Sequence, residues 1–336
     1  MFSKIFAITV TYGDRFYLLR NVLDRLLNEN VYKIIVVDNG SNPRSRSSLL
    51  DYQKSLNDNK LHILLLDKNY GSSVGFKKGI QFALQFDDCD FIWLLDDDNL
   101  PENGSLNIIR HVYAYLGSHS KTILTPYRRI KSNNYESVYF GRIFGYRPNA
   151  FLGFHIKDYF YKKFFCKKIY ILPGFLDKKN FFLIRQQVAP YGGLFFHKSV
   201  VSVVGYPDER FFTYADDHEW TMRMTKAGFD ICLCSEYKVS DIEVSSPKQD
   251  QNQIFNDSFL KYKFYLRLRN HTYLSFKLVD NYLLFYFHIV LFIIFNFFKS
   301  IFISPTYAVK KIYFTIIAIR DGIRADFSKD YNHFTQ

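Results

Sequence analysis

The sequence predicts an α/β fold with a mostly parallel sheet, followed by a C-terminal helical region. Short apolar runs alternate with segments of helical periodicity from residue 1 to about residue 125. Alternating strands and helices imply βαβ units, which favour parallel strand pairing. Polar and acidic residues directly follow several of the apolar runs. In the last third of the chain, a nearly continuous apolar segment is long enough for one long helix.

The first 125 residues contain strand-length apolar runs and segments with apolar residues three and four positions apart, which indicate helices. The expected strands are KIFAITVT, KIIVVDNGS (stopping at Asp38 before a turn), HILLLDKN, FIWLLDDDN and KTILTP. The expected helices are RFYLLRNVLDRLLNEN, SVGFKKGIQFALQF and NGSLNIIRHVYAYL. Because parallel strands end at the same edge of a sheet, we expect Asp38, Asn69 and Asp96–Asp98 to converge on one crevice.

Residues 127–189 break this alternation. The stretch HIKDYFYKKFFCKKIYILPGFLDKKNFF mixes aromatic residues with seven Lys. It could be an acceptor-binding excursion, a membrane-surface patch, or an aromatic core with solvated Lys. After it we expect a turn, a strand, a short helix, a loop and a helix opened by acidic residues. We expect a first domain over residues 1–246 that includes this excursion, and a helical region over residues 247–336.

Composition suggests classes of binding partner but does not identify one. The formal net charge is +12 and 19% of residues are aromatic. Such a chain favours an anionic partner, such as nucleic acid, an anionic membrane or a phosphorylated substrate, although a solvated basic surface explains the charge as well. The four cysteines are too few and scattered for a disulfide framework or a zinc site, so we expect reduced thiols in a cytosolic compartment. The N-terminal apolar run reaches a polar turn by Tyr12, which predicts a strand rather than a signal peptide.

The stretch FIWLLDDDN ends an expected strand on three adjacent acids. Adjacent carboxylates repel each other, which raises the pKa of at least one unless a cation lies among them. Side chains alternate along an extended segment, so Asp96 and Asp98 can face one way while Asp97 faces elsewhere. Because Mg²⁺ and Mn²⁺ bind carboxylates together with substrate phosphates, the triplet predicts a metal held by Asp96 and Asp98 against a diphosphate. The alternative is an acidic cap for the next helix.

Two further segments carry candidate chemistry. In NYGSSVGFKKG, a glycine recurs every four residues, which allows close approach of a phosphate or close helix packing; it matches neither a P-loop nor G-x-G-x-x-G. In FFTYADDHEWTMRM, Asp216, Asp217 and Glu219 open a helix, either as acids at its positive end or to present a general base. Gly192 and Gly193, upstream, would leave room for a bulky substrate beside that base.

Together, ITVTYGDR, VVDNGS, NYGSSVGFKKG, WLLDDDN, GGLFF and FFTYADDHEWTMRM resemble the motifs of family 2 glycosyltransferases of the GT-A fold. They occur in the family's order over residues 5 to about 245. Within that family, the chain is most similar to bacterial galactofuranosyltransferases and the related rhamnosyltransferases. The resemblance implies a Rossmann-like, mostly parallel sheet with helices on both faces, and an inverting transfer of a sugar from a nucleotide-sugar donor.

The resemblance also implies roles for individual residues. Asp217 would be the catalytic base. Mn²⁺ or Mg²⁺ would be held by Asp96, Asp98 and Asp241, and Asp241 takes the place of a metal-binding His of galactofuranosyltransferases. The donor-binding residues would be Thr11, Asp38, Asn69, Gly75 and Asp97. The acceptor-binding residues would be Gly192, Gly193, Asp216 and Glu219.

By the same resemblance, UDP-galactofuranose is the expected donor and dTDP-rhamnose the alternative. The expected acceptor is a lipid-linked saccharide of bacterial O-antigen or capsule synthesis, handled at the cytoplasmic face of the inner membrane, with no nucleic-acid partner. A haloacid-dehalogenase-like phosphatase built on Asp96 and Asp98 is a more distant alternative. The motif of such phosphatases usually closes the first strand of the domain, whereas here it follows three earlier strand–helix units. A non-enzymatic membrane- or polyanion-binding protein would leave both acidic clusters unexplained.

The segment NYLLFYFHIVLFIIFNFFKSIFISP has the ~20 apolar residues that a transmembrane helix requires. Its Lys, Phe and Tyr equally suit a helix that lies in the bilayer interface. We expect an interfacial helix; a spanning helix and a buried C-terminal helix hairpin are the alternatives.

Overall fold

A computed structural model describes residues 4–56, 59–116, 121–128, 146–157, 183–243, 255, 257–302 and 304–334. The chain forms two compact units. Unit 1 consists of Met1–Gly145, Leu176–Phe212 and Asp216–Val244. Unit 2 consists of Tyr146–Phe175, Thr213–Ala215 and Ser245–Gln336, so it includes part of the expected excursion as well as the C-terminal region.

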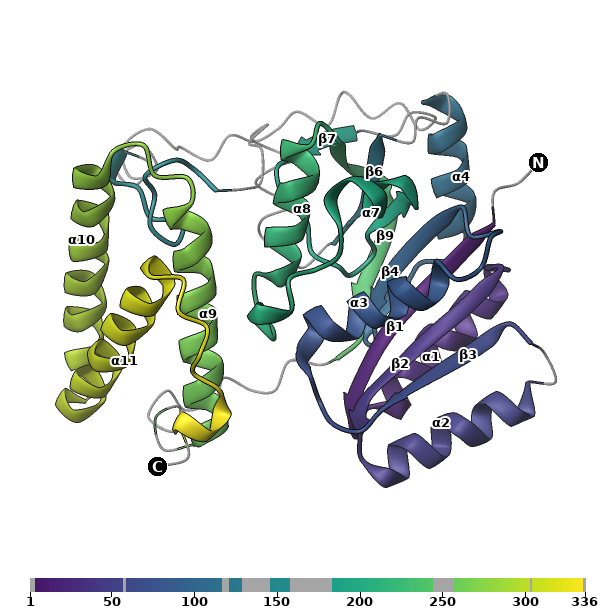
Figure 1. Ribbon diagram of the computed structural model, residues 1–336, viewed down its shortest axis with the longest axis horizontal. Coiled ribbons are helices and arrows are strands. Elements are labelled where there is room, and N and C mark those ends of the chain that lie inside the picture. The colour runs from purple at the N-terminus through teal and green to yellow at the C-terminus, as the bar shows by residue number, and fades with distance from the viewer. Residues whose placement is uncertain are drawn as a thin grey trace. The chain divides into compact units, whose positions relative to one another are not determined.

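Unit 1 is built on a nine-stranded sheet in the order β3-β2-β1-β4-β8-β6-β9-β5, with β7 beside β9 (Figure 1). The strands are β1 (Ile5–Gly13), β2 (Lys33–Ser41), β3 (Leu61–Leu66), β4 (Phe91–Asp96), β5 (Asn99–Pro101), β6 (Thr122–Tyr127), β7 (Leu183–Gln186), β8 (Phe195–His197) and β9 (Asp230–Asp241). Neighbouring strands among β1 to β4 pair in parallel, as do β6 and β9, whereas β8 runs antiparallel to β4 and β6. The expected mostly parallel sheet is confirmed.

Helices cover both faces of this sheet. They are α1 (Phe16–Asn28), α2 (Pro43–Ser55), α3 (Gly71–Ala83), α4 (Ser105–Tyr115), α7 (Ser199–Val204) and α8 (Asp216–Lys226), with a 3₁₀ turn η2 (Glu209–Phe211). Along β1, Ile5 and Ala7 face a core shared with α1, α2 and α4, while Phe6 and Ile8 face a core shared with α3, α7 and α8. The strands are therefore buried on both sides, which explains why they read as continuous apolar runs.

Two local features differ from the sequence-based expectation. The helix α2 was not expected, because its sequence PRSRSSLLDYQKS has only Ser45 and Leu49 buried and shows no apolar periodicity. The segment after β4 is not extended: Asp97 and Asp98 form a turn, and Asn99 begins the short strand β5, which pairs with β9. This pairing partner lies far along the chain, so local sequence could not reveal it.

Most of the excursion over residues 127–189, with Cys166, lies outside the described residues. The other three cysteines, Cys89, Cys232 and Cys234, are free thiols, as expected. Burial raises the pKa of each of these thiols, so they are poor nucleophiles at neutral pH.

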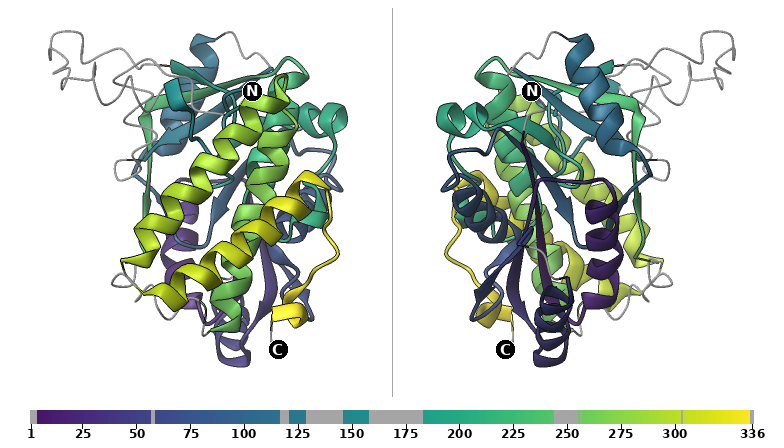
Figure 2. Two further views of the ribbon diagram at one scale, coloured as in Figure 1. Left: turned by 90° about the vertical axis from the view of Figure 1, so that its left-hand side faces the viewer. Right: turned by 90° about the vertical axis from the view of Figure 1, so that its right-hand side faces the viewer.

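Unit 2 contains three long helices, α9 (Ser258–Phe276), α10 (Tyr282–Ile301) and α11 (Pro305–Ile323), and a 3₁₀ turn η4 (Tyr331–Phe334). The helix α11 packs against both α9 and α10 (Figure 2). The polar His288 within α10 is buried: its Nε2 accepts from the backbone N–H of Ile156 at 3.2 Å, and its Nδ1 lies 2.7 Å from the carbonyl oxygen of Asn149. Among the described residues, α10 alone is long and apolar enough to cross a membrane.

Candidate active site

The carboxyl ends of β1, β2 and β4 meet at one edge of the sheet. Thr11 of β1 lies in register with Asp38 of β2, and Val10 lies in register with Asp96 of β4. Three of the residues predicted for the site therefore lie on adjacent strands at the same edge, as the parallel pairing requires.

Asp38 is fully buried at this edge and is already bonded. Its carboxylate accepts from the backbone N–H of Ser41 at 2.7 Å and from Nε of Arg46 at 2.8 Å. Arg46 also donates from Nη2 to the carbonyl oxygen of Leu66 at 2.6 Å, which joins the end of β2 to the end of β3. These bonds explain the burial of a charged side chain. The contact of Asp38 with the donor stays a prediction.

Asn39 is a residue that the sequence analysis missed. Its Oδ1 accepts from the backbone N–H of Tyr70 at 2.9 Å, and its Nδ2 donates to the carbonyl oxygen of Gly71 at 2.9 Å and to Oδ1 of Asn69 at 3.2 Å. The same Asn69 oxygen accepts from the backbone N–H of Gly71 at 2.8 Å. The turn before α3 is thus fixed by two amide side chains. The motif VVDNGS contains Asn39 directly after Asp38, but only Asp38 was given a role from the sequence.

The glycines of α3 are explained by packing. Gly71 has φ +85°, and a Cβ there would lie 2.0 Å from the carbonyl oxygen of Phe212. A Cβ at Gly75 would lie 2.6 Å from Cγ1 of Val10, so close contact between α3 and β1 requires glycine there. This packing accounts for Gly75 without a ligand, and its predicted contact with the donor stays untested.

Asp97 is directed toward Arg15, another residue that the sequence analysis missed. Arg15 donates from Nε and Nη2 to Oδ1 of Asp97 at 3.0 and 2.9 Å, and Thr11 donates from Oγ1 to Oδ2 at 2.8 Å. Arg15 also bonds Glu243 from Nη1 at 2.8 Å. Burial raises the pKa of the Asp97 carboxyl, and Arg15 and Thr11 counteract this rise by bonding the ionised form. Both oxygens of Asp97 are thus used within the protein, while its contact with the donor stays a prediction.

Asp98 and Asp241 are held together by Asn99. The Nδ2 of Asn99 donates to Oδ1 of Asp241 at 2.9 Å and to Oδ1 of Asp98 at 3.1 Å. Arg128 donates from Nη1 to the same Oδ1 of Asp241 at 3.0 Å. The structure therefore brings Asp241 beside the acidic triplet, as predicted, but places an arginine against it.

Gly192 and Gly193 lie against this cluster. A Cβ at Gly192 would lie 1.8 Å from Nη2 of Arg128 and 1.8 Å from Oδ1 of Asn99. The space expected beside Gly192 for a substrate is therefore filled by protein side chains. Gly193 has φ +91° and donates its N–H to the carbonyl oxygen of Leu94 at 2.7 Å. A contact of either glycine with the acceptor stays a prediction.

Asp216 and Asp217 open α8 in different surroundings. Asp216 is only 3% exposed, and its Oδ2 accepts from Oγ of Ser72 at 2.7 Å. Burial, followed by the charge of Asp217, raises the pKa of Asp216 to about 8. Asp217 is half-buried and accepts from the backbone N–H of His218 at 2.8 Å. The raised pKa keeps Asp216 mainly protonated at neutral pH.

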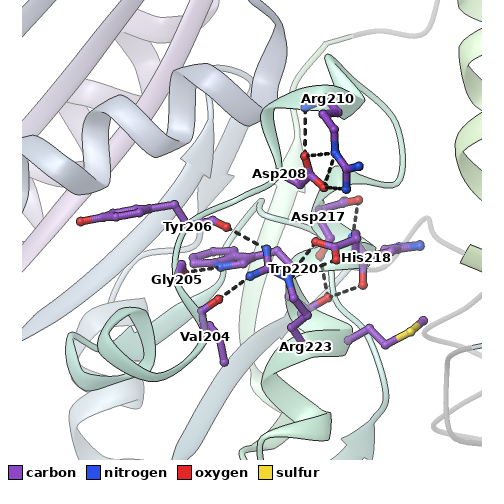
Figure 3. A network of polar contacts seen from close by, with 12 residues as sticks. Val204, Gly205, Tyr206, Asp208, Arg210, Asp217, His218, Trp220 and Arg223 are labelled. Atoms are coloured by element: carbon purple, nitrogen blue, oxygen red, sulfur yellow. Dashed lines mark hydrogen bonds and ion pairs between the residues drawn. The ribbon is translucent and has the colours of Figure 1, made fainter. Parts of the chain in front are cut away.

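Trp220 and Arg223 fasten α8 to the preceding loop, and Glu219 orients Arg223 (Figure 3). Nε of Arg223 donates to both carboxylate oxygens of Glu219 at 3.1 and 2.9 Å, and its Nη2 donates to the carbonyl oxygen of Tyr206 at 2.7 Å. Nε1 of Trp220 donates to the carbonyl oxygen of Gly205 at 2.9 Å. This anchoring explains the burial of Glu219, whose contact with the acceptor stays a prediction.

The end of β4 fits a divalent cation by its chemistry. Burial, followed by the charges of Asp97 and Asp241, raises the pKa of Asp98, and a cation beside Asp98 would oppose this rise. The oxygen-only donor set suits Mn²⁺ or Mg²⁺. No group of three or more His, Cys, Asp or Glu able to hold a metal occurs in the part of the chain that the structure describes. A cation at Asp96 and Asp98 would therefore need further ligands from substrate phosphate or water.

Comparison with known proteins identifies a matching family model and a similar protein. Residues 7–171 match the family model described as glycosyl transferase family 2. The chain is 25% identical over 241 residues to the dTDP-rhamnosyl transferase RfbF of Shigella flexneri, an alignment that covers 71% of this chain and 69% of that protein.

Solved structures support the fold. The mannosyltransferase PcManGT from Pyrobaculum calidifontis, in complex with GDP-Man and Mn²⁺, aligns with a TM-score of 0.54 and 11% identity over 100% of this chain and 84% of that chain. GalNAc-T7 with UDP, GalNAc and Mn²⁺ aligns with a TM-score of 0.50 and 12% identity over 80% of this chain. This alignment spans 51% of the GalNAc-T7 chain.

The pKa of Asp216 generates a prediction about stability. Its folded value of about 8 exceeds the ~3.9 of an unfolded Asp, so the native state holds the extra proton between these values. The free energy of unfolding should therefore fall as pH rises from about 4 to 8, by at most ~1.4 kcal/mol per pH unit. We expect Asp216→Asn, which mimics the protonated acid, to remove this pH dependence of the free energy of unfolding. Urea titrations at pH 5 to 8 would measure it. Asp51→Asn, at an exposed site on α2, should follow the wild-type curve; parallel curves for Asp216→Asn and wild type would disprove the assignment.

Proposed function

We propose that this chain is a family 2 glycosyltransferase that takes a sugar from a nucleotide-sugar donor and transfers it, with inversion at the anomeric carbon, to a lipid-linked saccharide. The hydrogen bond between Ser72 and Asp216 is the observation that carries this proposal. It joins the start of α3, next to Asn69, to the start of α8, which carries Asp217. The predicted base is thereby fixed to the turn predicted to line the donor.

In the proposed reaction, Asp217 accepts the proton of an acceptor hydroxyl while that oxygen bonds to the anomeric carbon. The bond from this carbon to the nucleoside diphosphate breaks on the opposite side, so the configuration inverts. Asp217 lies in the first turn of α8. Protonated Asp216 adds no negative charge beside it.

Asp96 and Asp98 are the residues we propose to hold a divalent cation. When bound, Mn²⁺ or Mg²⁺ would neutralise charge on the departing nucleoside diphosphate. The solved relatives in complex with Mn²⁺ and a nucleotide or nucleotide sugar support this choice of cofactor.

For the donor we place dTDP-rhamnose ahead of UDP-galactofuranose. The relative from Shigella flexneri, named a dTDP-rhamnosyl transferase, supports this order. Asp241 stands where galactofuranosyltransferases are expected to carry a metal-binding His, and this departure supports the order as well.

The helix α10 supports a membrane-bound acceptor. The length and composition of α10 fit a membrane helix and a core helix equally. The exposure of its apolar side chains distinguishes the two. Buried side chains, such as Phe285 and Ile289, occupy one side of α10. A stripe of exposed apolar side chains occupies another: Leu283, Phe287, Val290, Ile294 and Phe298. At its C-terminal end, Phe302 is 87% exposed beside the exposed Lys299.

An apolar helix face with basic residues at its end suits an anionic bilayer interface. Residues 245–336 contain twelve Lys and Arg against six Asp and Glu, so this part of the chain is attracted to anionic lipid. We therefore propose that unit 2 binds the cytoplasmic surface of the bacterial inner membrane, where a lipid-linked intermediate of O-antigen or capsule would be glycosylated.

A thermal-shift panel tests the donor class. We expect dTDP-rhamnose with Mn²⁺ to raise the Tm of the full chain, since ligand at 100 times its Kd stabilises a protein by about 2.7 kcal/mol. The panel would contain dTDP-rhamnose, UDP-galactofuranose, UDP-glucose and GDP-mannose, each with and without Mn²⁺. Stabilisation by UDP-galactofuranose alone would reverse the order of the two donors. Absence of any metal-dependent shift would contradict the proposed donor site.

Substitution of the base tests the reaction. A positioned general base contributes roughly 10²- to 10⁴-fold, so Asp217→Asn should lower kcat by about that factor with donor and metal saturating. The same assay on Asp208→Asn, which alters a partly exposed ion pair with Arg210 in the adjacent loop, should give turnover within a few-fold of wild type. Near wild-type kcat for Asp217→Asn would exclude Asp217 as the base.

Vesicle binding tests the membrane surface. The triple variant Leu283→Ser, Phe287→Ser and Ile294→Ser should lose about tenfold or more in partitioning to anionic vesicles, because it removes exposed apolar area from α10. A matched control replaces three exposed apolar residues of unit 1, Tyr17, Tyr115 and Val203, by Ser. Equal binding of both variants and the wild type would contradict the surface. Resistance of the wild type to alkaline extraction from membranes would indicate a spanning rather than an interfacial helix.

A further inference from the structure

Arg128 is a buried arginine in the acidic cluster, and the predicted roles do not include it. Its side chain is 4% exposed. From Nη1 it donates to Oδ1 of Asp241 at 3.0 Å, and from Nη2 it donates to Oδ1 of Asn99 at 2.7 Å and to the carbonyl oxygen of Gly192 at 2.6 Å. The guanidinium therefore bonds three different segments at the end of β4.

The surroundings of Arg128 are shaped to hold a guanidinium. A Cβ at position 192 would lie 1.8 Å from Nη2 of Arg128, so any other residue there would displace the guanidinium. Asn99 turns its oxygen toward Arg128 and its nitrogen toward Asp98 and Asp241, an orientation that the β5–β9 pairing of Asn99 with Asp241 supports. This fit shows that the arginine is part of the cluster.

The charge of Arg128 bears on the predicted metal ligands. Oδ1 of Asp241 accepts from both Arg128 and Asn99, so this carboxylate is neutralised and oriented by protein groups. On the other side of the triplet, Arg15 bonds Asp97 and Glu243 and approaches Asp98 only to 3.9 Å. The two arginines thus bond Asp97, Glu243 and Asp241 directly, and their fixed positive charges oppose the entry of a divalent cation.

We propose that Arg128 is a positioning residue that keeps Asp241 out of the metal's ligand set, so that the divalent cation binds weakly until a nucleoside diphosphate supplies further oxygen ligands. This inference rests on the proposed function and deepens it. The diphosphate contributes both the ligands that Asp241 withholds and the negative charge that offsets Arg128. Metal and donor binding are therefore coupled, each raising the affinity for the other by the same factor.

The test measures Mn²⁺ binding through the electron paramagnetic resonance signal of unbound Mn²⁺, without donor. Arg128→Met removes the guanidinium and releases Asp241, so Mn²⁺ should bind about tenfold more tightly than to wild type. In the double variant Arg128→Met/Asp241→Asn this gain should disappear, because the released ligand is absent. Arg46→Met, which removes an arginine from Asp38 of β2, serves as the matched control and should leave Mn²⁺ affinity unchanged.

Equal or weaker Mn²⁺ binding by a folded Arg128→Met chain would overturn the proposal, as would a gain that persists without Asp241. If Arg128→Met does not fold, the wild type decides: its Mn²⁺ affinity should rise at least about tenfold when dTDP or UDP is added, and an unchanged affinity overturns the proposal. The donor-free comparison involves no sugar transfer. If the chain showed no glycosyltransferase activity, the Mn²⁺ binding comparison would still test the role of Arg128. The two failures can therefore be told apart.

Discussion

The end of β4 depends on one constraint: a carboxylate can be buried only if a hydrogen-bonded cation or a proton accompanies it. Asp97 satisfies this through Arg15, and Asp241 through Arg128. Each arginine comes from a different part of the chain, so the acids connect β1, β4, β5 and β9 at one edge of the sheet. The resulting site combines an excess of negative charge with two fixed positive charges, which suits a metal-diphosphate better than a metal alone.

The acids at the start of α8 meet the same constraint by a different means. Asp216 is as buried as Asp97, yet it accepts from the hydroxyl of Ser72 and lies beside the charge of Asp217, and burial raises its pKa. A proton therefore takes the place of an arginine. This difference suits the proposed chemistry, because protonated Asp216 adds no charge beside the proposed base Asp217, whereas residues that hold a metal-diphosphate must keep their charges.

The sequence predicted most of the fold and part of the site. Apolar runs at strand length located β1 to β4, and the parallel pairing then brought Thr11, Asp38 and Asp96 to one edge. Arg15 and Arg128 could not be found this way, because no local pattern marks them. Arg15 lies 82 residues from its partner Asp97, and Arg128 lies 113 residues from Asp241. The helix α2 was missed because it buries little apolar surface. For Gly75 and Glu219, a motif does not distinguish a residue that packs from one that binds, so their contacts with donor and acceptor remain predictions.

The residues that lead into α8 fold with the C-terminal helical unit. Every residue predicted for the site belongs to unit 1, but the chain leaves unit 1 after Phe212 and returns to it at Asp216. In the intervening segment, Tyr214 and Ala215 have positive φ, a conformation that costs energy for residues other than glycine and needs support. Asn270 of α9 supplies it by donating to the carbonyl oxygens of Thr213 and Tyr214 at 2.8 and 2.9 Å. This support comes from within unit 2, so a segment flanked on both sides by unit 1 is stabilised by the C-terminal helices.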